Sequence, residues 1–112
     1  LPRVMPKAIA MEYLATGKHI PVEQALQFGM INRLVPNGAH LVGAIELATS
    51  IIENAPIAVR ESLTIARQAF DLTDAELIQL TAEANLRIHH TADAKEGPLA
   101  FVEKRKPKWT GR

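Results

Sequence analysis

Apolar residues recur at helical spacing through most of the chain beyond residue 40, and this periodicity limits the fold more than any other feature. One apolar stripe runs along residues 41–52, another along 59–70 and a third along 77–88, with steps of three and four residues. Aromatic residues make up only 4% of the chain, so aliphatic side chains must build the core. The sequence therefore predicts a mainly α-helical protein.

Two short helices are predicted before residue 30. Each opens at a proline, which suits the first helical position, and each stops at a glycine, which accepts a left-handed backbone. The pairs are Pro6 with Gly17 and Pro21 with Gly29.

The segment 30–35 is predicted to form one short strand, closed by Pro36. Asn37 and Gly38 then mark a turn, after which the long helical stripes begin. A domain boundary is therefore predicted between residues 1–36 and residues 37–112.

Later helix boundaries carry their own signals. Pro56 should end one helix and start the next. Thr73 and Glu76 have the spacing of a capping box. A last helix is predicted over 93–104, either continuous or restarting at Pro98. Every long helix has a wide apolar stripe, so each needs a partner surface, either in the same protein or in another subunit.

The composition excludes several classes of protein. Hydrophobic residues make up 47% and charged residues 22%, which indicates a globular chain rather than a disordered one. The net charge of +1 gives no reason to expect nucleic acid or membrane as a partner. No apolar run is long enough to span a bilayer. The absence of cysteine excludes thiolate catalysis and favours a reducing compartment.

No catalytic or metal-binding motif is apparent. The four histidines lack the i, i+4 spacing of a helical metal site, because two are isolated and two are adjacent, so solvated or capping roles are expected. These histidines are His19, His40, His89 and His90. No glycine-rich phosphate loop and no G-x-S-x-G motif is present. The glutamates mostly occupy positions expected to be solvated helix faces.

The tail from residue 103 to 112 holds five basic residues and the only tryptophan. One interpretation is a solvated end that Trp109 docks on the body of the protein. The other is an anion site, in which Lys104 pairs with phosphate and Phe101 lies one helical turn earlier. The residues alone leave both interpretations open, and Phe101 could equally be a buried anchor of its helix.

Three blocks, in order, resemble the end of the enoyl-CoA hydratase/isomerase (crotonase) family. KAIAMEYLATG at 7–17 and IPVEQALQFGMINRLVP at 20–36 are similar to the family's A-x-x-x-x-L-T-G and A-x-x-x-G-L-V-N-x-V-V-P. DAKEGPLAFVEKRKP at 93–107 resembles D-x-x-E-G-x-x-A-F-x-E-K-R-x-P, with Pro98 as a departure from the commoner pattern. The chain also begins at Leu1 without an initiator methionine, so a processed chain or a carboxy-terminal portion is expected.

This resemblance implies a fold and an assembly. Residues 1–36 would be the end of the family's ββα spiral core, including its last short strand. Residues 37–112 would be the helical carboxy-terminal domain, which contacts neighbouring subunits. Trimers or pairs of trimers are typical of the family, so a homo-oligomer is expected. The cytoplasm is the expected location, or the mitochondrial matrix in a eukaryote.

The resemblance also implies a reaction on acyl-CoA thioesters, most simply the addition of water to a 2-enoyl-CoA in fatty-acid metabolism. The family uses two glutamates and an oxyanion loop, which it carries upstream of the position matching Leu1. No residue of this chain is therefore assigned a catalytic role, no metal or cofactor is expected, and the chain alone should be inactive. Phe101 and Lys104 match family positions that contact coenzyme A. Isomerase or CoA-ester hydrolase activity of the parent, and a free-standing helical oligomerisation module, remain the alternatives.

Overall fold

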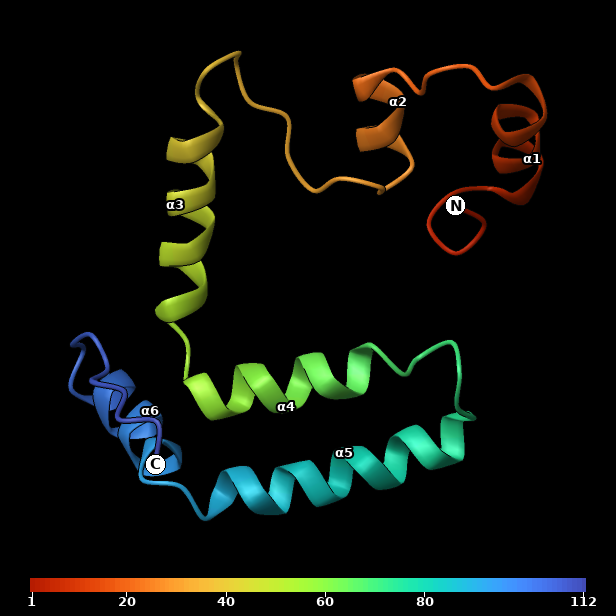
Figure 1. Ribbon diagram of the computed structural model, residues 1–112. Helices are drawn as coiled ribbons and strands as arrows, with labels where there is room; N and C mark the ends of the chain where they lie inside the picture. The colour runs from red at the N-terminus through yellow and green to blue at the C-terminus, as the bar shows by residue number, and fades with distance from the viewer. The chain divides into compact units, whose positions relative to one another are not determined.

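The computed structural model describes residues 1–112, and all its regular elements are helices (Figure 1). The six helices are α1 (Lys7–Thr16), α2 (Val22–Gln27), α3 (His40–Ile52), α4 (Pro56–Ala66), α5 (Asp74–His89) and α6 (Asp93–Val102). The predicted mainly α-helical fold is thus confirmed. The chain divides into two compact units, Leu1–Gly43 and Ala44–Arg112. These units are not the predicted domains, whose boundary after residue 36 stays a prediction.

The first unit is organised around two short helices. Met5 and Ala10 are its buried apolar residues. The Tyr13 hydroxyl of α1 donates a hydrogen bond to the side-chain carbonyl of Gln24 on α2, at an O···O distance of 2.5 Å. Gly17 ends α1 with φ +64°, in the left-handed conformation that its sequence position predicted. Pro6 lies one position earlier than expected, at the N-cap rather than inside the helix.

The strand predicted over 30–35 does not form, and that prediction is wrong. Gly29 is left-handed with φ +75°, and the Met30 N–H then donates back to the Ala25 carbonyl at 2.9 Å. The Gly29 N–H donates to the Leu26 carbonyl at 3.1 Å, which completes a Schellman motif at the end of α2. A strand also needs a neighbouring strand for its backbone hydrogen bonds, and this chain has none to offer.

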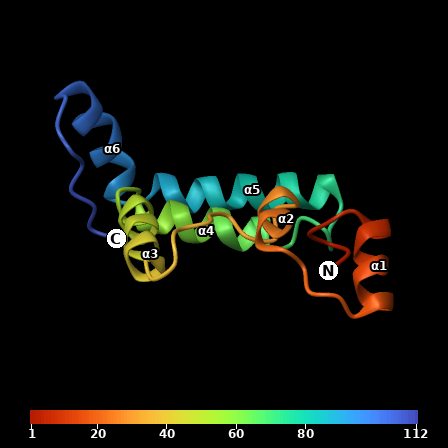
Figure 2. The same cartoon turned by 90° about the horizontal axis from the view of Figure 1, so that it is seen from above.

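The second unit contains an antiparallel pair of helices, α4 and α5, which lie side by side in both ribbon views (Figures 1 and 2). The Arg87 guanidinium on α5 donates to both carboxylate oxygens of Glu61 on α4, at 3.2 and 2.7 Å. This bidentate pairing lowers the pKa of Glu61. The predicted capping box is confirmed at the start of α5, where Thr73 and Glu76 bond reciprocally.

The end of α4 differs from the sequence prediction. The apolar stripe predicted helix as far as Phe70, but α4 ends at Ala66, because the Gln68 and Ala69 N–H groups donate to carbonyls three residues back. Phe70 is left 76% exposed.

The last helix, α6, ends at Val102 and not at residue 104 as predicted, and it runs without interruption through Pro98, one of the two possibilities that the sequence left open. The preceding residue is Gly97, which has no Cβ to clash with the proline ring, so the helical backbone can continue.

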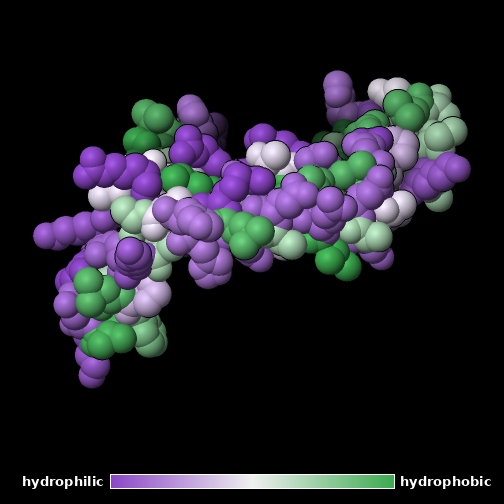
Figure 3. Space-filling view, turned by 90° about the horizontal axis from the view of Figure 1, so that it is seen from below, coloured by the Kyte–Doolittle hydropathy of each residue, from purple (hydrophilic) through white to green (hydrophobic).

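Burial is sparse in both units. No large side chain is fully buried, and the buried apolar residues of the second unit are Ala84 and Ala100. No residue of α3 is buried. Figure 3 shows patches of apolar residues at the surface among hydrophilic ones. No single helix is long and apolar enough to cross a bilayer; α3 and α4 would pass that test only together, across a 106° bend.

Candidate functional site

The two predicted coenzyme A contacts, Phe101 and Lys104, lie where α6 ends. Phe101 occupies the last turn of the helix and is 85% exposed. It is therefore no buried anchor of its helix within this chain. Leu99 and Val102 are exposed beside it in the sequence, at 49% and 76%. The end of α6 thus presents an aromatic ring and aliphatic side chains to the outside of the unit.

Lys104 terminates α6 in an unusual backbone conformation. It is the only non-glycine residue with a positive φ, +54°. Its N–H donates to the Phe101 carbonyl at 3.2 Å, and the next N–H, of Arg105, donates to the Ala100 carbonyl at 3.0 Å. This is a Schellman motif with lysine at the position that normally selects glycine.

The same motif ends α2, where Gly29 takes the left-handed position. A non-glycine residue in this conformation costs about 1 kcal/mol or more, and such strain clusters at functional sites. Stability alone would therefore be served better by glycine at position 104 than by lysine.

Arg105, the residue after this strained position, binds two carboxylates. Its Nη1 and Nη2 donate to Glu96 at 2.5 and 3.0 Å, and its Nε donates to Glu103 at 2.5 Å. The Lys108 backbone N–H also donates to Glu96, at 2.6 Å. The Arg105 hydrogen bonds, then the Lys108 amide, lower the pKa of Glu96 to about 2, while the same pairing raises the pKa of Arg105.

Asp93 fastens the end of the tail to the start of α6. One carboxylate oxygen accepts from the Thr110 N–H and hydroxyl at 2.7 and 3.0 Å, and the other accepts from the Gly111 N–H at 2.9 Å. Asp93 is only 3% exposed, and its desolvation is compensated by these three donors. They hold the pKa of Asp93 below its ordinary value, the Thr110 amide most of all. The Ala92 N–H adds a bond to the Arg112 carbonyl at 2.7 Å.

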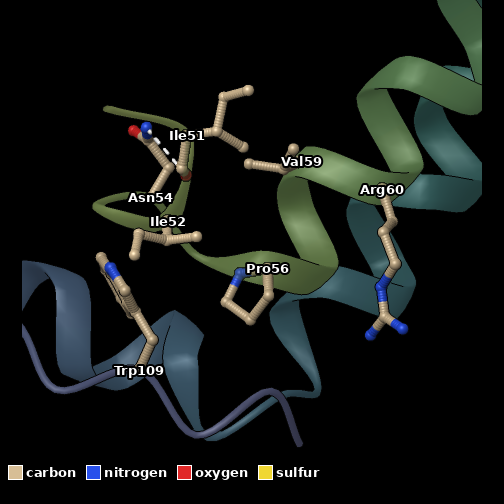
Figure 4. A pocket seen from close by; sticks show the side chains of 7 residues that line it. All are labelled: Ile51, Ile52, Asn54, Pro56, Val59, Arg60 and Trp109. Carbon is tan, nitrogen blue, oxygen red and sulfur yellow. Dashed lines mark hydrogen bonds between the residues drawn. The ribbon is translucent and has the colours of Figure 1, made fainter. Parts of the chain in front are cut away.

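Trp109 docks the tail on the body of the second unit, as one of the two sequence interpretations predicted. Its indole N–H donates to the Glu53 carbonyl, beyond the end of α3, at 2.8 Å. Its ring lies against Gly97, where an added Cβ would stand 3.4 Å away. Figure 4 shows the indole beside Ile52 and Pro56, at a hollow of about 520 Å³. The Arg60 guanidinium points away from the indole, so the hollow is mainly apolar.

Of the three cations that directly follow α6, Lys104, Arg105 and Lys106, one has no ion-pair partner. Arg105 is paired, and the Lys106 ammonium lies 3.7 Å from the Glu53 carboxylate. No carboxylate pairs with the exposed Lys104 side chain. An unneutralised ammonium three residues after an exposed aromatic ring can bind a phosphate while the ring packs on an adjoining base or chain.

The remaining polar residues show no catalytic arrangement. His90 Nδ1 lies 2.6 Å from the Leu86 carbonyl, consistent with the capping role expected for a histidine. No three potential metal ligands lie together. Ser50 donates to the carbonyl one turn before it, at 3.0 Å, and so has no basic partner. A second hollow, of about 330 Å³, lies between α1 and α2 beside Tyr13 and Gln24.

The polar cluster that holds the tail was not predicted from the sequence. Glu96 was expected at a solvated helix position, but its side chain is only 18% exposed and accepts three hydrogen bonds. A signal was available, because Asp93 and Glu96 are three residues apart and therefore lie on one face of α6. The direction in which the tail would return could not be read from that spacing.

Comparisons with known proteins identify relatives of this chain. The chain is 38% identical to carnitinyl-CoA dehydratase of Salmonella arizonae, over 99% of this chain and 44% of that protein. It is 37% identical to enoyl-CoA hydratase EchA19 of Mycobacterium tuberculosis, over 100% of this chain and 42% of that protein. The chain thus spans less than half the length of these relatives.

Solved structures give the same assignment. The crystal structure of an enoyl-CoA hydratase from Mycobacterium tuberculosis matches with a TM-score of 0.94 and 37% identity, covering all of this chain and 44% of that one. Enoyl-CoA hydratase EchA1 from Mycobacterium marinum matches with a TM-score of 0.93 and 39% identity, covering 99% and 46%. The enoyl-CoA hydratase/isomerase family model matches residues 1–112, and the chain belongs to that family.

Proposed function

We propose that this chain is the coenzyme A-contacting carboxy-terminal part of an acyl-CoA lyase, most simply an enoyl-CoA hydratase. Its relatives include a carnitinyl-CoA dehydratase and an enoyl-CoA hydratase. The substrate would be a 2-enoyl-CoA of fatty-acid metabolism. The observation that carries the proposal is that exposed Phe101 and Lys104, which has no ion-pair partner and a strained backbone, both lie at the end of α6.

The two side chains would divide the recognition of the ligand. Phe101, with its ring 85% exposed, would pack on the coenzyme A moiety. The Lys104 ammonium would pair with one of its phosphates. The strained backbone of Lys104 supports this role, because a purely structural helix end would favour glycine.

The chain by itself should not catalyse the reaction. Neither hollow described above is lined by two glutamates, and no residue here is assigned the family's acid or base role. Binding and catalysis are therefore separable in this proposal. Turnover of crotonyl-CoA by the purified 112-residue chain would contradict it.

The sharpest test of the binding role is Lys104→Gly. Glycine adopts the left-handed position without strain, so the folded chain should be as stable as the original or slightly more stable. Its affinity for coenzyme A, titrated by backbone NMR shifts, should fall about fivefold because an exposed ion pair is lost. Unchanged affinity in Lys104→Gly would exclude the proposed contact.

Assembly and location belong to the same proposal. The exposed apolar side chains of α3, α5 and α6 support a homo-oligomeric parent, a trimer or a pair of trimers. The proposed location is the cytoplasm, or the mitochondrial matrix in a eukaryote, with neither nucleic acid nor membrane as partner. A free-standing oligomerisation module is the second candidate, favoured by the same apolar faces, and it predicts self-association without any coenzyme A shift. Isomerase or CoA-ester hydrolase activity of the parent would be separated from hydratase activity by product analysis.

A further inference from the structure

Four consecutive charged residues, Glu103 to Lys106, follow α6, and their pairing is selective. Glu103, Lys104 and Arg105 are adjacent, and Glu96 lies close enough to reach the same cluster. Lys104 directly follows Glu103, and a lysine and a carboxylate this close in sequence attract each other. Here Arg105 binds both carboxylates, with N···O distances of 2.5 Å to Glu96 and 2.5 Å to Glu103.

The shape of the guanidinium explains why one residue can occupy both partners. Arginine has five N–H donors in a planar fork, whereas lysine presents a single ammonium. Arg105 directs its two terminal nitrogens to Glu96 and its Nε to Glu103, and Nη1 also reaches the Lys106 carbonyl at 3.2 Å. Its side chain is 33% exposed, so the cluster is partly shielded from water.

The other carboxylates around the tail are occupied as well. Both oxygens of Asp93 accept hydrogen bonds from Thr110 or Gly111. The Glu53 carboxylate lies 3.7 Å from the Lys106 ammonium. Each of these carboxylates thus has a bonded partner other than Lys104, and no ion pair joins Lys104 to any of them.

We propose that Arg105 is a positioning residue, which keeps Glu96 and Glu103 from pairing with Lys104 so that its ammonium stays available to a ligand phosphate. This inference rests on the proposed binding of coenzyme A, and it adds how the cation is kept free. Arg105 also holds the backbone on the far side of Lys104, since its N–H closes the Schellman motif on Ala100. Without the Arg105 guanidinium, Glu96 or Glu103 should pair with Lys104, and Lys104 should then bind the ligand phosphate more weakly.

The test is a set of coenzyme A titrations on the full 112-residue chain, followed by backbone NMR shifts. Arg105→Met should weaken binding about as much as Lys104→Met does, roughly fivefold each. The triple variant Arg105→Met/Glu96→Gln/Glu103→Gln removes the competing carboxylates and should return to within about twofold of the original affinity. Arg105→Lys should lie between, because one ammonium cannot occupy both carboxylates.

Two control variants separate this effect from net charge. Lys95→Met removes one exposed cation of α6 outside the cluster and should change the affinity by less than about twofold. Arg105→Met/Glu46→Gln/Glu83→Gln removes two carboxylates on α3 and α5 instead, and it should stay as weak as Arg105→Met. Amide protection of Thr110 and Gly111 reports in each variant whether the tail is still fastened.

The outcomes are distinct. If Arg105→Met binds like the original chain, or if the triple variant stays weak with its tail intact, the shielding role is wrong. If Lys104→Met itself binds like the original chain, or the original chain does not bind coenzyme A, the proposed function fails and the shielding role fails with it. If Lys104→Met and Arg105→Met both bind coenzyme A weakly and the triple variant recovers its affinity, the result supports the proposed function and the shielding role of Arg105.

Discussion

The tail beyond α6 and helix α3 differ in where their side chains find contacts. The tail beyond α6 is fastened within the chain by directional polar contacts, with Asp93, Glu96 and Trp109 each bonded to a specific partner. By contrast, α3 has a continuous apolar stripe, no buried residue and several isoleucines about half exposed or more. The contrast teaches that the tail finds its polar partners within this chain, while α3 presents a surface that apolar contact with another polypeptide surface would stabilise.

Acidification should release the tail from α6 and leave the helical structure of α3 unchanged. This is the largest effect expected. The folded-state pKa values of Asp93 and Glu96 lie below their ordinary values. Such groups stabilise the folded form above their unfolded pKa, and this stability is lost as the pH falls through the folded pKa. For Glu96 the window runs from 4.5 down to about 2.

Trp109 fluorescence should therefore change as the pH falls through this window, as the indole leaves the Glu53 carbonyl. In Glu96→Gln the change attributable to Glu96 should disappear. A pH-independent Trp109 signal down to about pH 2 would show that the carboxylates do not hold the tail.

Asp93→Ala should release the terminal residues at neutral pH. It removes the acceptor of three hydrogen bonds, from the Thr110 amide and hydroxyl and the Gly111 amide. Hydrogen exchange at these two amides should accelerate by at least about tenfold. Asp74→Ala is the matched control, since Asp74 lies in the first turn of α5 away from the tail. Equal exchange rates in the two variants would refute the role assigned to Asp93.

Trp109→Phe should have a smaller effect, because it keeps the ring packing and removes only the indole N–H bond to Glu53. We expect the free energy of urea unfolding to fall by about 1 kcal/mol. Trp109→Ala also removes the packing over Gly97 and Ile52, and about 2 kcal/mol is expected for this half-buried ring. If both variants unfold like the original, Trp109 does not anchor the tail.

Ile45→Gln should have the smallest effect on stability. Ile45 is 57% exposed on α3, so the unfolding free energy should stay within about 0.5 kcal/mol. Self-association measured by sedimentation should nevertheless weaken if the α3 stripe is a contact surface. A loss of unfolding free energy well above about 0.5 kcal/mol would show that the α3 stripe already packs within the chain. The α3 stripe and the tail would then no longer differ in this respect.

Local sequence signals predicted much of the fold. The capping box at Thr73 and Glu76, the proline that opens α4 and the left-handed Gly17 and Gly29 all appear where they were predicted. These features depend on the backbone preferences of single residues and on contacts three or four positions apart. The predicted strand at 30–35 failed because a strand depends on a distant partner, which local pattern cannot supply.

The candidate site was predicted only in part. The sequence singled out Phe101 and Lys104 through a family resemblance, and Trp109 as the residue that docks the tail. It did not predict that Lys104 would take a left-handed conformation or that Arg105 would bind Glu96 and Glu103 together. These pairings join residues two to nine positions apart across a chain reversal, whose course depends on where Trp109 and Asp93 anchor the tail.

The sequence by itself determined that this protein is helical, where most of its helices begin and end, and which family it resembles, because backbone propensities and short-range periodicity act within one or two turns. The tertiary structure alone decided that the tail folds back along α6, that Asp93 becomes buried, and that Lys104 stays free among paired charges. Ion pairing and burial depend on which groups meet in space, and several carboxylates and cations in one short segment allow many pairings that only the folded chain selects.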